Sequence, residues 1–246
     1  MADLKYRTAA QTRTGARPLD IDAGLRAYML RVYNYMALGV AVTAIVTLFV
    51  AGNPALMATI ALGPAKWVLF IGILGLGFMA PRLIFSGNAM MAHAAYWGYA
   101  VLWGILIAPM IALYMGIDGG ALIVQALGLT AVTFGATSLA GYVTKRDLSG
   151  MGGFFMMATI GLLIAIVANA LFFQSTFMSL ITSMIVVVVF AAITAYETQM
   201  IKAMYVEGDG TGVAQGKAIF GAFMLYGSFI TLFIHILNIL GIMRSD

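Results

Sequence analysis

Residues 177–200 have the sequence FMSLITSMIVVVVFAAITAYETQM, in which Glu197 is the only charged side chain. A helix needs about 20 predominantly apolar residues to cross the hydrocarbon core of a bilayer. The strands of a membrane barrel alternate in polarity over about ten residues, and this stretch does not alternate. Because backbone polar groups in lipid must be satisfied within their own segment, the stretch predicts a transmembrane α-helix.

Six further apolar runs surround this stretch. They cover about residues 32–51, 66–85, 89–115 (interrupted by Pro109), 120–143, 151–173 and 217–242. The links between runs are short, for example Gln174-Ser175-Thr176, so neighbouring helices must be antiparallel and no second domain has room. We therefore expect an all-α polytopic membrane protein, with a basic tail over residues 1–31 and a single seven-helix domain over 32–246.

The composition excludes several classes of protein. Of the 246 residues, 63% are hydrophobic and 9% are charged, against about 45–50% and about 25% in a soluble domain. Disordered chains are poor in apolar residues, so disorder is excluded as well. The chain has no cysteine, which removes disulfides, Cys-ligated zinc and a thiol nucleophile. No phosphate-binding loop and no Ser-His-Asp arrangement is present, and we expect no enzyme, no cofactor and no metal site.

The basic residues predict the orientation of the chain. Six lie in the tail: Lys5, Arg7, Arg13, Arg17, Arg26 and Arg31. If the amino terminus is cytoplasmic, eleven of the thirteen Lys and Arg residues lie on the cytoplasmic side, and Lys66 and Arg244 lie outside. Cytoplasmic loops carry an excess of Lys and Arg, so this orientation is expected. It also accounts for the net charge of +4 without a nucleic-acid partner.

Two charged residues near the cytoplasmic membrane face are candidates for function. Ionisable residues within a membrane mark functional sites by default, and Glu197 lies near the end of the sixth run. Arg82 follows Pro81 at the inner end of the second run and is a possible counter-ion for Glu197. The alternatives are a helix-end Glu197 paired with Lys202 in the headgroup region, and an Arg82 that anchors the helix by snorkelling.

The seventh run carries a polar stripe. Ser228, Thr231, His235 and Asn238 are spaced 3, 4 and 3 residues apart, which puts them on one helical face. Such a face is expected to turn inward, where it lines a water-filled path or forms interhelical hydrogen bonds. His235 is the titratable member of the stripe, and an imidazole near neutral pH can change its charge.

Several motifs resemble one known family. They are Thr133-Phe134-Gly135-Ala136-Thr137-Ser138 through Gly141-Tyr142, the connection TKRDLSG at 144–150, Arg31-Val32-Tyr33, and Tyr196-Glu197-Thr198-Gln199. Together they resemble the bacterial inner-membrane branch of the Bax inhibitor-1 (transmembrane Bax inhibitor motif) family. The similarity runs from about Arg26 to Gly241. The resemblance implies seven helices with the last one central.

The resemblance also implies a mechanism. Members of the family are described as pH-sensitive calcium leaks or ion exchangers and as regulators of cell death, and some bacterial members bind a membrane-bound protease. The family gate is pictured as two aspartates that share a proton, with a basic residue on helix two nearby. Two close carboxylates titrate as a coupled pair.

Carried over to this chain, Glu197 matches the first acid and Arg82 the basic residue. Ser228, in Leu225-Tyr226-Gly227-Ser228, takes the place of the second acid, so the acid pair is absent. Either a Glu197–Arg82 ion pair or a Glu197–Ser228 hydrogen bond is then expected to hold the inner gate.

These features support three hypotheses for a protein of the bacterial inner membrane with a cytoplasmic amino terminus. The first is a pH-sensitive cation (calcium) leak channel whose gate and ion pathway comprise Glu197, Arg82, Ser228, Thr231 and His235, with calcium or protons as the permeant ions. The second is a non-transporting regulator that binds another membrane protein, such as a quality-control protease, through the basic tail. The third is a secondary exchanger, for which the sequence shows no internal repeat.

Overall fold

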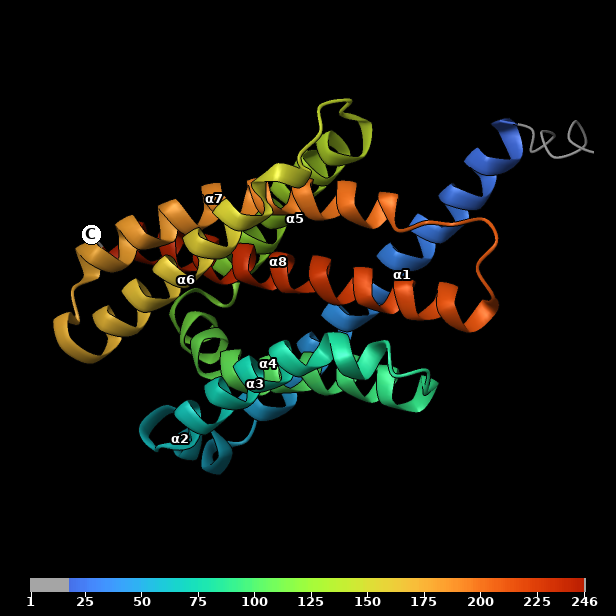
Figure 1. The fold of residues 1–246 in the computed structure, drawn as a ribbon. Coiled ribbons are helices and arrows are strands. Elements are labelled where there is room, and N and C mark those ends of the chain that lie inside the picture. The colour runs from blue at the N-terminus through green and yellow to red at the C-terminus, as the bar shows by residue number, and fades with distance from the viewer. Residues whose placement is uncertain (1–17, 246) are drawn as a thin grey trace, which may run out of the picture.

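The computed structural model describes residues 18–245, and within them the chain is helical with no strand (Figure 1). The α-helices are α1 (Pro18–Ala51), α2 (Pro54–Leu62), α3 (Ala65–Ile84), α4 (Ala89–Asp118), α5 (Ala121–Val143), α6 (Gly152–Ala168), α7 (Thr176–Ala203) and α8 (Thr211–Ser245). Short helical turns flank α6: η1 (Ser149–Met151) and the π-turn η2 (Asn169–Phe173). Seven segments, one of them α6 with its flanking turns, are long and apolar enough to cross a membrane. The expected all-α polytopic fold is confirmed.

Polar side chains and glycines define the helix ends. The side chains of Asn53, Asn88 and Ser175 accept hydrogen bonds from the first backbone N–H groups of α2, α4 and α7. Those N–H groups have no partner within their own helix. Gly119 and Gly120 have φ angles of 70° and 91°, and this left-handed backbone, which favours glycine, turns the chain from α4 into α5.

The first helix begins earlier than its apolar run. Residues 1–17 of the expected basic tail lie outside the described residues, whereas residues from Pro18 onward belong to α1. Further along α1, Tyr28 packs against the α7–α8 connection, because its ring centroid lies 5.7 Å from that of Tyr205. The short helix α2 was not expected. Pro109 lies inside α4 without ending it, which membrane helices tolerate.

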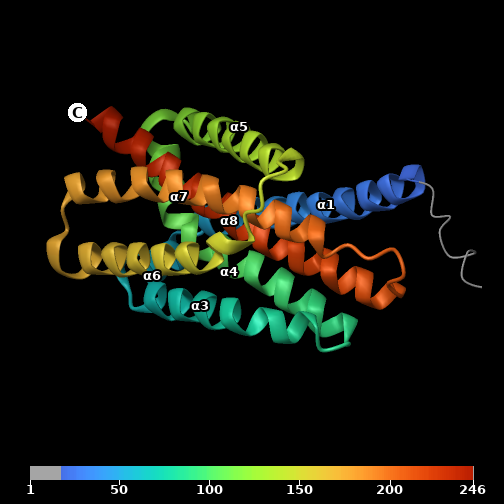
Figure 2. The same cartoon turned by 45° about the horizontal axis from the view of Figure 1, so that its top comes forward.

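Helix α8 is the centre of the bundle. In its most apolar window 61% of the residues are buried, against 6–28% in the other six spans. The helices α1, α4, α5 and α7 all pack against it, and Figure 2 shows it crossing behind α7 through the middle of the bundle. The central last helix that the family resemblance implied is therefore confirmed.

The two ends of the bundle carry different connections. Figure 2 shows the beginning of α1 and the α3–α4 and α7–α8 turns at one end, and the α6–α7 turn and the carboxyl terminus at the other. Helix α8 has 35 residues and at 1.5 Å per residue is about 52 Å long, more than the hydrocarbon thickness of about 30 Å. It is therefore long enough to cross the bilayer completely.

Helices α5 and α7 approach closely at Gly141. A Cβ atom added to Gly141 would come within 2.7 Å of the Ala195 Cα atom, which belongs to the backbone of α7. Small residues allow such close approach of membrane helices. Gly128, on the same helix, has nothing within 4 Å of the equivalent position.

We predict that Gly141→Ala destabilises the protein, because the added methyl group meets backbone rather than a movable side chain. The expected loss is about 1–3 kcal/mol, as for overpacked sites generally. Thermal unfolding of the purified protein in detergent, followed by tryptophan fluorescence, measures it. Gly128→Ala is the matched control, and equal midpoints for the two variants would contradict the prediction.

Candidate functional site

Glu197 of α7 is hydrogen-bonded to Ser228 of α8. The Ser228 hydroxyl donates to Glu197 Oε2 at 2.7 Å. Ser228 is 2% exposed and Glu197 is partly buried. Hydrogen bonds to an ionised acceptor are shorter and stronger than neutral ones. Glu197 is the only acidic residue in the seven apolar runs. Its hydrogen bond to the buried Ser228 therefore joins α7 to the central helix α8.

Arg82 does not take part in this contact. Its side chain is exposed in the last turn of α3, and among the described residues no ion pair joins it to Glu197. The helix dipole favours a cation at the carboxyl-terminal end of a helix. A long basic side chain can reach the headgroup region from that position. Three partners were considered for Glu197, and among the described residues it is bonded to Ser228 and forms no ion pair with Arg82 or Lys202.

A chain of hydroxyl groups begins next to Glu197. Thr198 donates its proton to the Thr194 carbonyl at 2.8 Å, so it accepts from the Ser138 hydroxyl at 2.9 Å. Ser138 has then used its own proton and accepts from the Tyr33 hydroxyl at 2.6 Å, since each hydroxyl has one proton to donate. The chain links α1, α5 and α7 and fixes the direction of each bond.

Gln199 joins the two most specific sequence motifs. Its Oε1 atom accepts from the Leu148 N–H at 2.8 Å, and its Nε2 atom donates to the Arg146 carbonyl at 2.9 Å. Lys202 Nζ donates to the Tyr142 carbonyl at 2.9 Å and lies 4.8 Å from the centre of the Tyr142 ring. The segment around Glu197 thus holds the connection at 144–150 against the end of α7.

Asp147 closes the turn inside this connection. The Ser149 N–H donates to its carboxylate at 2.9 Å. This hydrogen bond lowers the pKa of the exposed Asp147 carboxyl below its ordinary value, because the backbone donor favours the charged form. The carboxylate is therefore a local turn-former.

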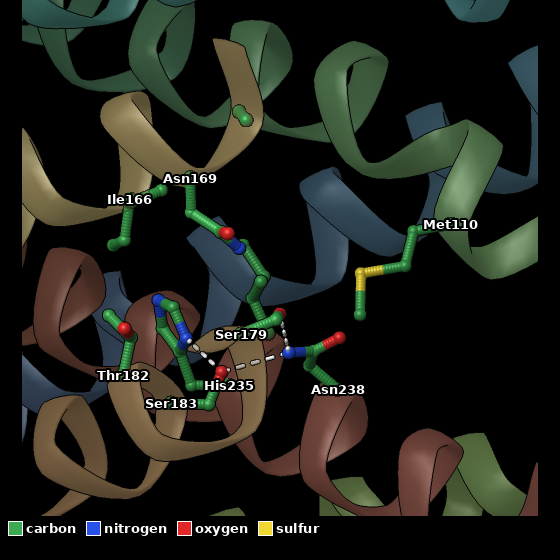
Figure 3. Close-up of a pocket in the computed structure, with 10 residues that line it drawn as sticks. Met110, Ile166, Asn169, Ser179, Thr182, Ser183, His235 and Asn238 are labelled. Carbon is green, nitrogen blue, oxygen red and sulfur yellow. Dashed lines mark hydrogen bonds between the residues drawn. The ribbon is translucent and has the colours of Figure 1, made fainter. Parts of the chain in front are cut away.

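A second polar site lies toward the other end of α8 (Figure 3). The His235 Nδ1 atom lies 3.0 Å from the Ser183 hydroxyl, and the Asn238 amide donates to the hydroxyls of Ser179 and Ser183, each at 2.9 Å. These groups border a pocket of about 240 Å³. Its lining residues are Met110, Ile166, Asn169, Ala170, Ser179, Thr182, Ser183, Ile234, His235 and Asn238.

The polar stripe of α8 faces α7. Ser228, His235 and Asn238 all contact α7 side chains, whereas Thr231 donates to the Gly227 carbonyl of its own helix at 2.8 Å. Of the two uses considered for the stripe, interhelical hydrogen bonds are present at three positions. His235 and Asn238 line the pocket, whereas Ser228 and Thr231 are not among its lining residues.

Of the residues that line this second site, only His235 and Asn238 were predicted, and three of the others form hydrogen bonds. Ser179 and Ser183 are one helical turn apart in an apolar span, a spacing that could have been matched to the stripe on α8. Asn169 lies in the π-turn η2, where its side chain both donates to the Ser175 carbonyl and accepts from the Ser175 N–H, at 3.2 and 3.1 Å. Its part in closing the α6–α7 turn follows from backbone geometry that the sequence does not reveal.

The chemistry available at the Glu197–Ser228 contact is limited. Glu197 and Ser228 together offer three oxygen atoms, fewer than the six to eight that Ca²⁺ takes. Within residues 18–245 no group of three or more His, Cys, Asp or Glu side chains is placed to hold a metal ion. The pair is suited to a transient interaction with a cation or to proton exchange.

Comparison with known proteins supports one family. Residues 25–245 match the family model described as inhibitor of apoptosis-promoting Bax1. The chain is 38% identical to protein RP147 of Rickettsia prowazekii over 241 residues, which cover 94% of this chain and 96% of the relative. It is 34% identical to the inner membrane protein YbhL of Escherichia coli over 222 residues, 89% and 93% of the two chains. The chain therefore belongs to the Bax inhibitor family of integral membrane proteins.

Proposed function

We propose that the protein is a passive, pH-sensitive cation leak of a bacterial inner membrane, in which the Glu197–Ser228 hydrogen bond is the closed gate. The observation that supports the proposal is the 2.7 Å contact itself, which ties the central helix α8 to α7 at a carboxylate. The inner membrane is part of the proposal because the Escherichia coli relative is named an inner membrane protein. We also propose that the protein acts without catalysing a reaction.

The proposed orientation places the beginning of α1 in the cytoplasm. Arg82, Lys145, Arg146, Lys202 and Lys217 then lie on the cytoplasmic side. The asymmetry of Lys and Arg favours this side as cytoplasmic. The gate is then at the cytoplasmic end, and the pocket beside His235 opens toward the outer half of the bundle.

The gate works by competition for one carboxylate. While Ser228 donates to Glu197, α7 and α8 remain joined, and a cation that passes must replace this donor. Protonation of Glu197 removes the negative charge that attracts the cation, so the flux is expected to fall at acidic pH. The permeant ion is calcium or a proton, and the small number of oxygen ligands favours weak, transient binding over a stable calcium site.

We predict that Glu197→Gln lowers the cation flux of the protein in liposomes to the rate of empty vesicles. The amide still accepts the Ser228 hydrogen bond, so the fold is kept while the charge is lost. Calcium and proton flux are measured with entrapped dyes at acidic and neutral pH. Glu207→Gln, in the exposed α7–α8 connection, is the matched control and should leave the flux unchanged.

The result that removes Glu197 from the mechanism is unchanged flux in Glu197→Gln. If the wild-type protein itself gives no flux above empty vesicles at either pH, the leak proposal fails. The regulator hypothesis would then be favoured.

We predict that Ser228→Asp strengthens the pH dependence of the flux. The new carboxylate would lie within hydrogen-bond distance of Glu197, and two such groups share one proton at acidic pH and repel each other when both are ionised. The ratio of flux at neutral pH to flux at acidic pH should exceed that of the wild type. Ser228→Asn is the control, because asparagine has the size of aspartate without its charge. Equal flux ratios in the two variants would contradict the prediction.

A further inference from the structure

A groove separates α1 from α5. Both helices pack against α8, but they share no extended contact with each other. The groove between them has a volume of about 690 Å³ and is lined by residues of these two helices alone. Pockets for small ligands have volumes of about 300–1,000 Å³ and are mostly apolar with few polar groups, and this groove has that character.

The groove is apolar along most of its length and opens toward the side of the bundle. Met29 and Phe134 are 4% and 6% exposed and form its buried part. Leu30 and Leu139 are 53% and 62% exposed and form its edges. At Gly135 an added Cβ would meet nothing within 4 Å. In a membrane protein such a lateral opening faces lipid tails.

One end of the groove is positively charged. Arg26 is the one charged side chain among its lining residues, and none of them is acidic. Arg26 is exposed, and among residues 23–244, whose side chains are described except for 61, 62 and 118, no ion pair of Arg26 is present.

We propose that this groove binds one anionic phospholipid, with an acyl chain between Leu30 and Leu139 and the phosphate group at Arg26. Basic pockets between transmembrane helices bind the headgroups of acidic lipids, and the apolar length provides the matching site for the tail. A free phosphate ion would use Arg26 and leave the apolar part without a ligand. The N-terminal residues of the chain are a poor occupant, because Lys5, Arg7, Arg13 and Arg17 would repel Arg26.

The bound lipid would lie beside the hydroxyl chain described above. Tyr33 and Ser138 both line the groove, and they continue the hydrogen bonds to Thr198, the residue after Glu197. The lipid site is therefore connected by hydrogen bonds to the segment of α7 that contains Glu197. The proposal itself concerns binding and does not depend on transport.

The test is native mass spectrometry of the purified protein released from nanodiscs that contain phosphatidylglycerol and phosphatidylcholine in equal amounts. The wild type should retain one phosphatidylglycerol in preference to phosphatidylcholine. Arg26→Gln should lower this preference about five-fold, the effect expected of one basic residue near an anionic headgroup. Arg31→Gln, an exposed residue of the same helix that does not line the groove, should keep the preference.

A second pair of variants tests the acyl chain. Leu139→Trp fills the groove and keeps Arg26, so it should abolish retention of the lipid. Leu38→Trp, 55% exposed on α1 outside the groove, should not. Unfolding midpoints measured in parallel identify any variant that fails to fold.

Three results would overturn the proposal. They are equal preference in Arg26→Gln and Arg31→Gln, equal retention of the two lipids by the wild type, and displacement of phosphatidylglycerol by millimolar inorganic phosphate. The last would assign Arg26 to a soluble anion. Because the readout is the number of bound lipids, absence of ion flux in liposomes would leave this proposal intact.

Discussion

A carboxylate among apolar helices has to find a hydrogen-bond donor, and this requirement organises the bundle. Glu197 meets it through Ser228, whose hydroxyl is 2.7 Å away on the central helix. An unpaired polar group in an apolar environment costs several kcal/mol, so the rotation of α7 about its axis is fixed by this contact. The same rotation turns Ser179 and Ser183 toward Asn238 and His235. One face of α7 therefore meets the polar stripe of α8 along most of its length.

The serine at position 228 distinguishes the site from the pair of acids that the family resemblance implied. Two carboxylates in contact hold a shared proton and repel each other when both lose it. A carboxylate and a hydroxyl attract each other whether the carboxyl group is protonated or ionised, because the hydroxyl donates in both cases. The geometry of the Glu197–Ser228 contact is therefore less sensitive to pH than that of a pair of carboxylates. Any pH response of this contact must come from the change in charge of Glu197.

The motifs that led to the family are parts of one structural unit. The Gln199 side chain is hydrogen-bonded to two backbone groups of the 144–150 connection, the Arg146 carbonyl and the Leu148 N–H. Lys202 donates a hydrogen bond to the carbonyl of Tyr142. Gly141 provides the space for α5 and α7 to come together immediately before this connection. The residues around Glu197 thus combine an acid with the contacts that position it. The groove between α1 and α5 begins beside the same unit, since Tyr142 and Ser138 line it.

The amino-acid sequence determined the number of spans, because seven apolar runs of about 20 residues have no stable alternative to helices in lipid. It also identified Glu197, Ser228 and the stripe on α8, because single polar residues stand out in apolar runs. The tertiary structure decided which residues meet. Arg82 and Ser228 are both expected at the same end of the bundle, and only the packing of α3 and α7 around α8 shows that Arg82 is exposed while Ser228 contacts the acid. The length of α1 and the α1–α5 groove likewise depend on contacts between distant segments, which local patterns of polarity do not encode.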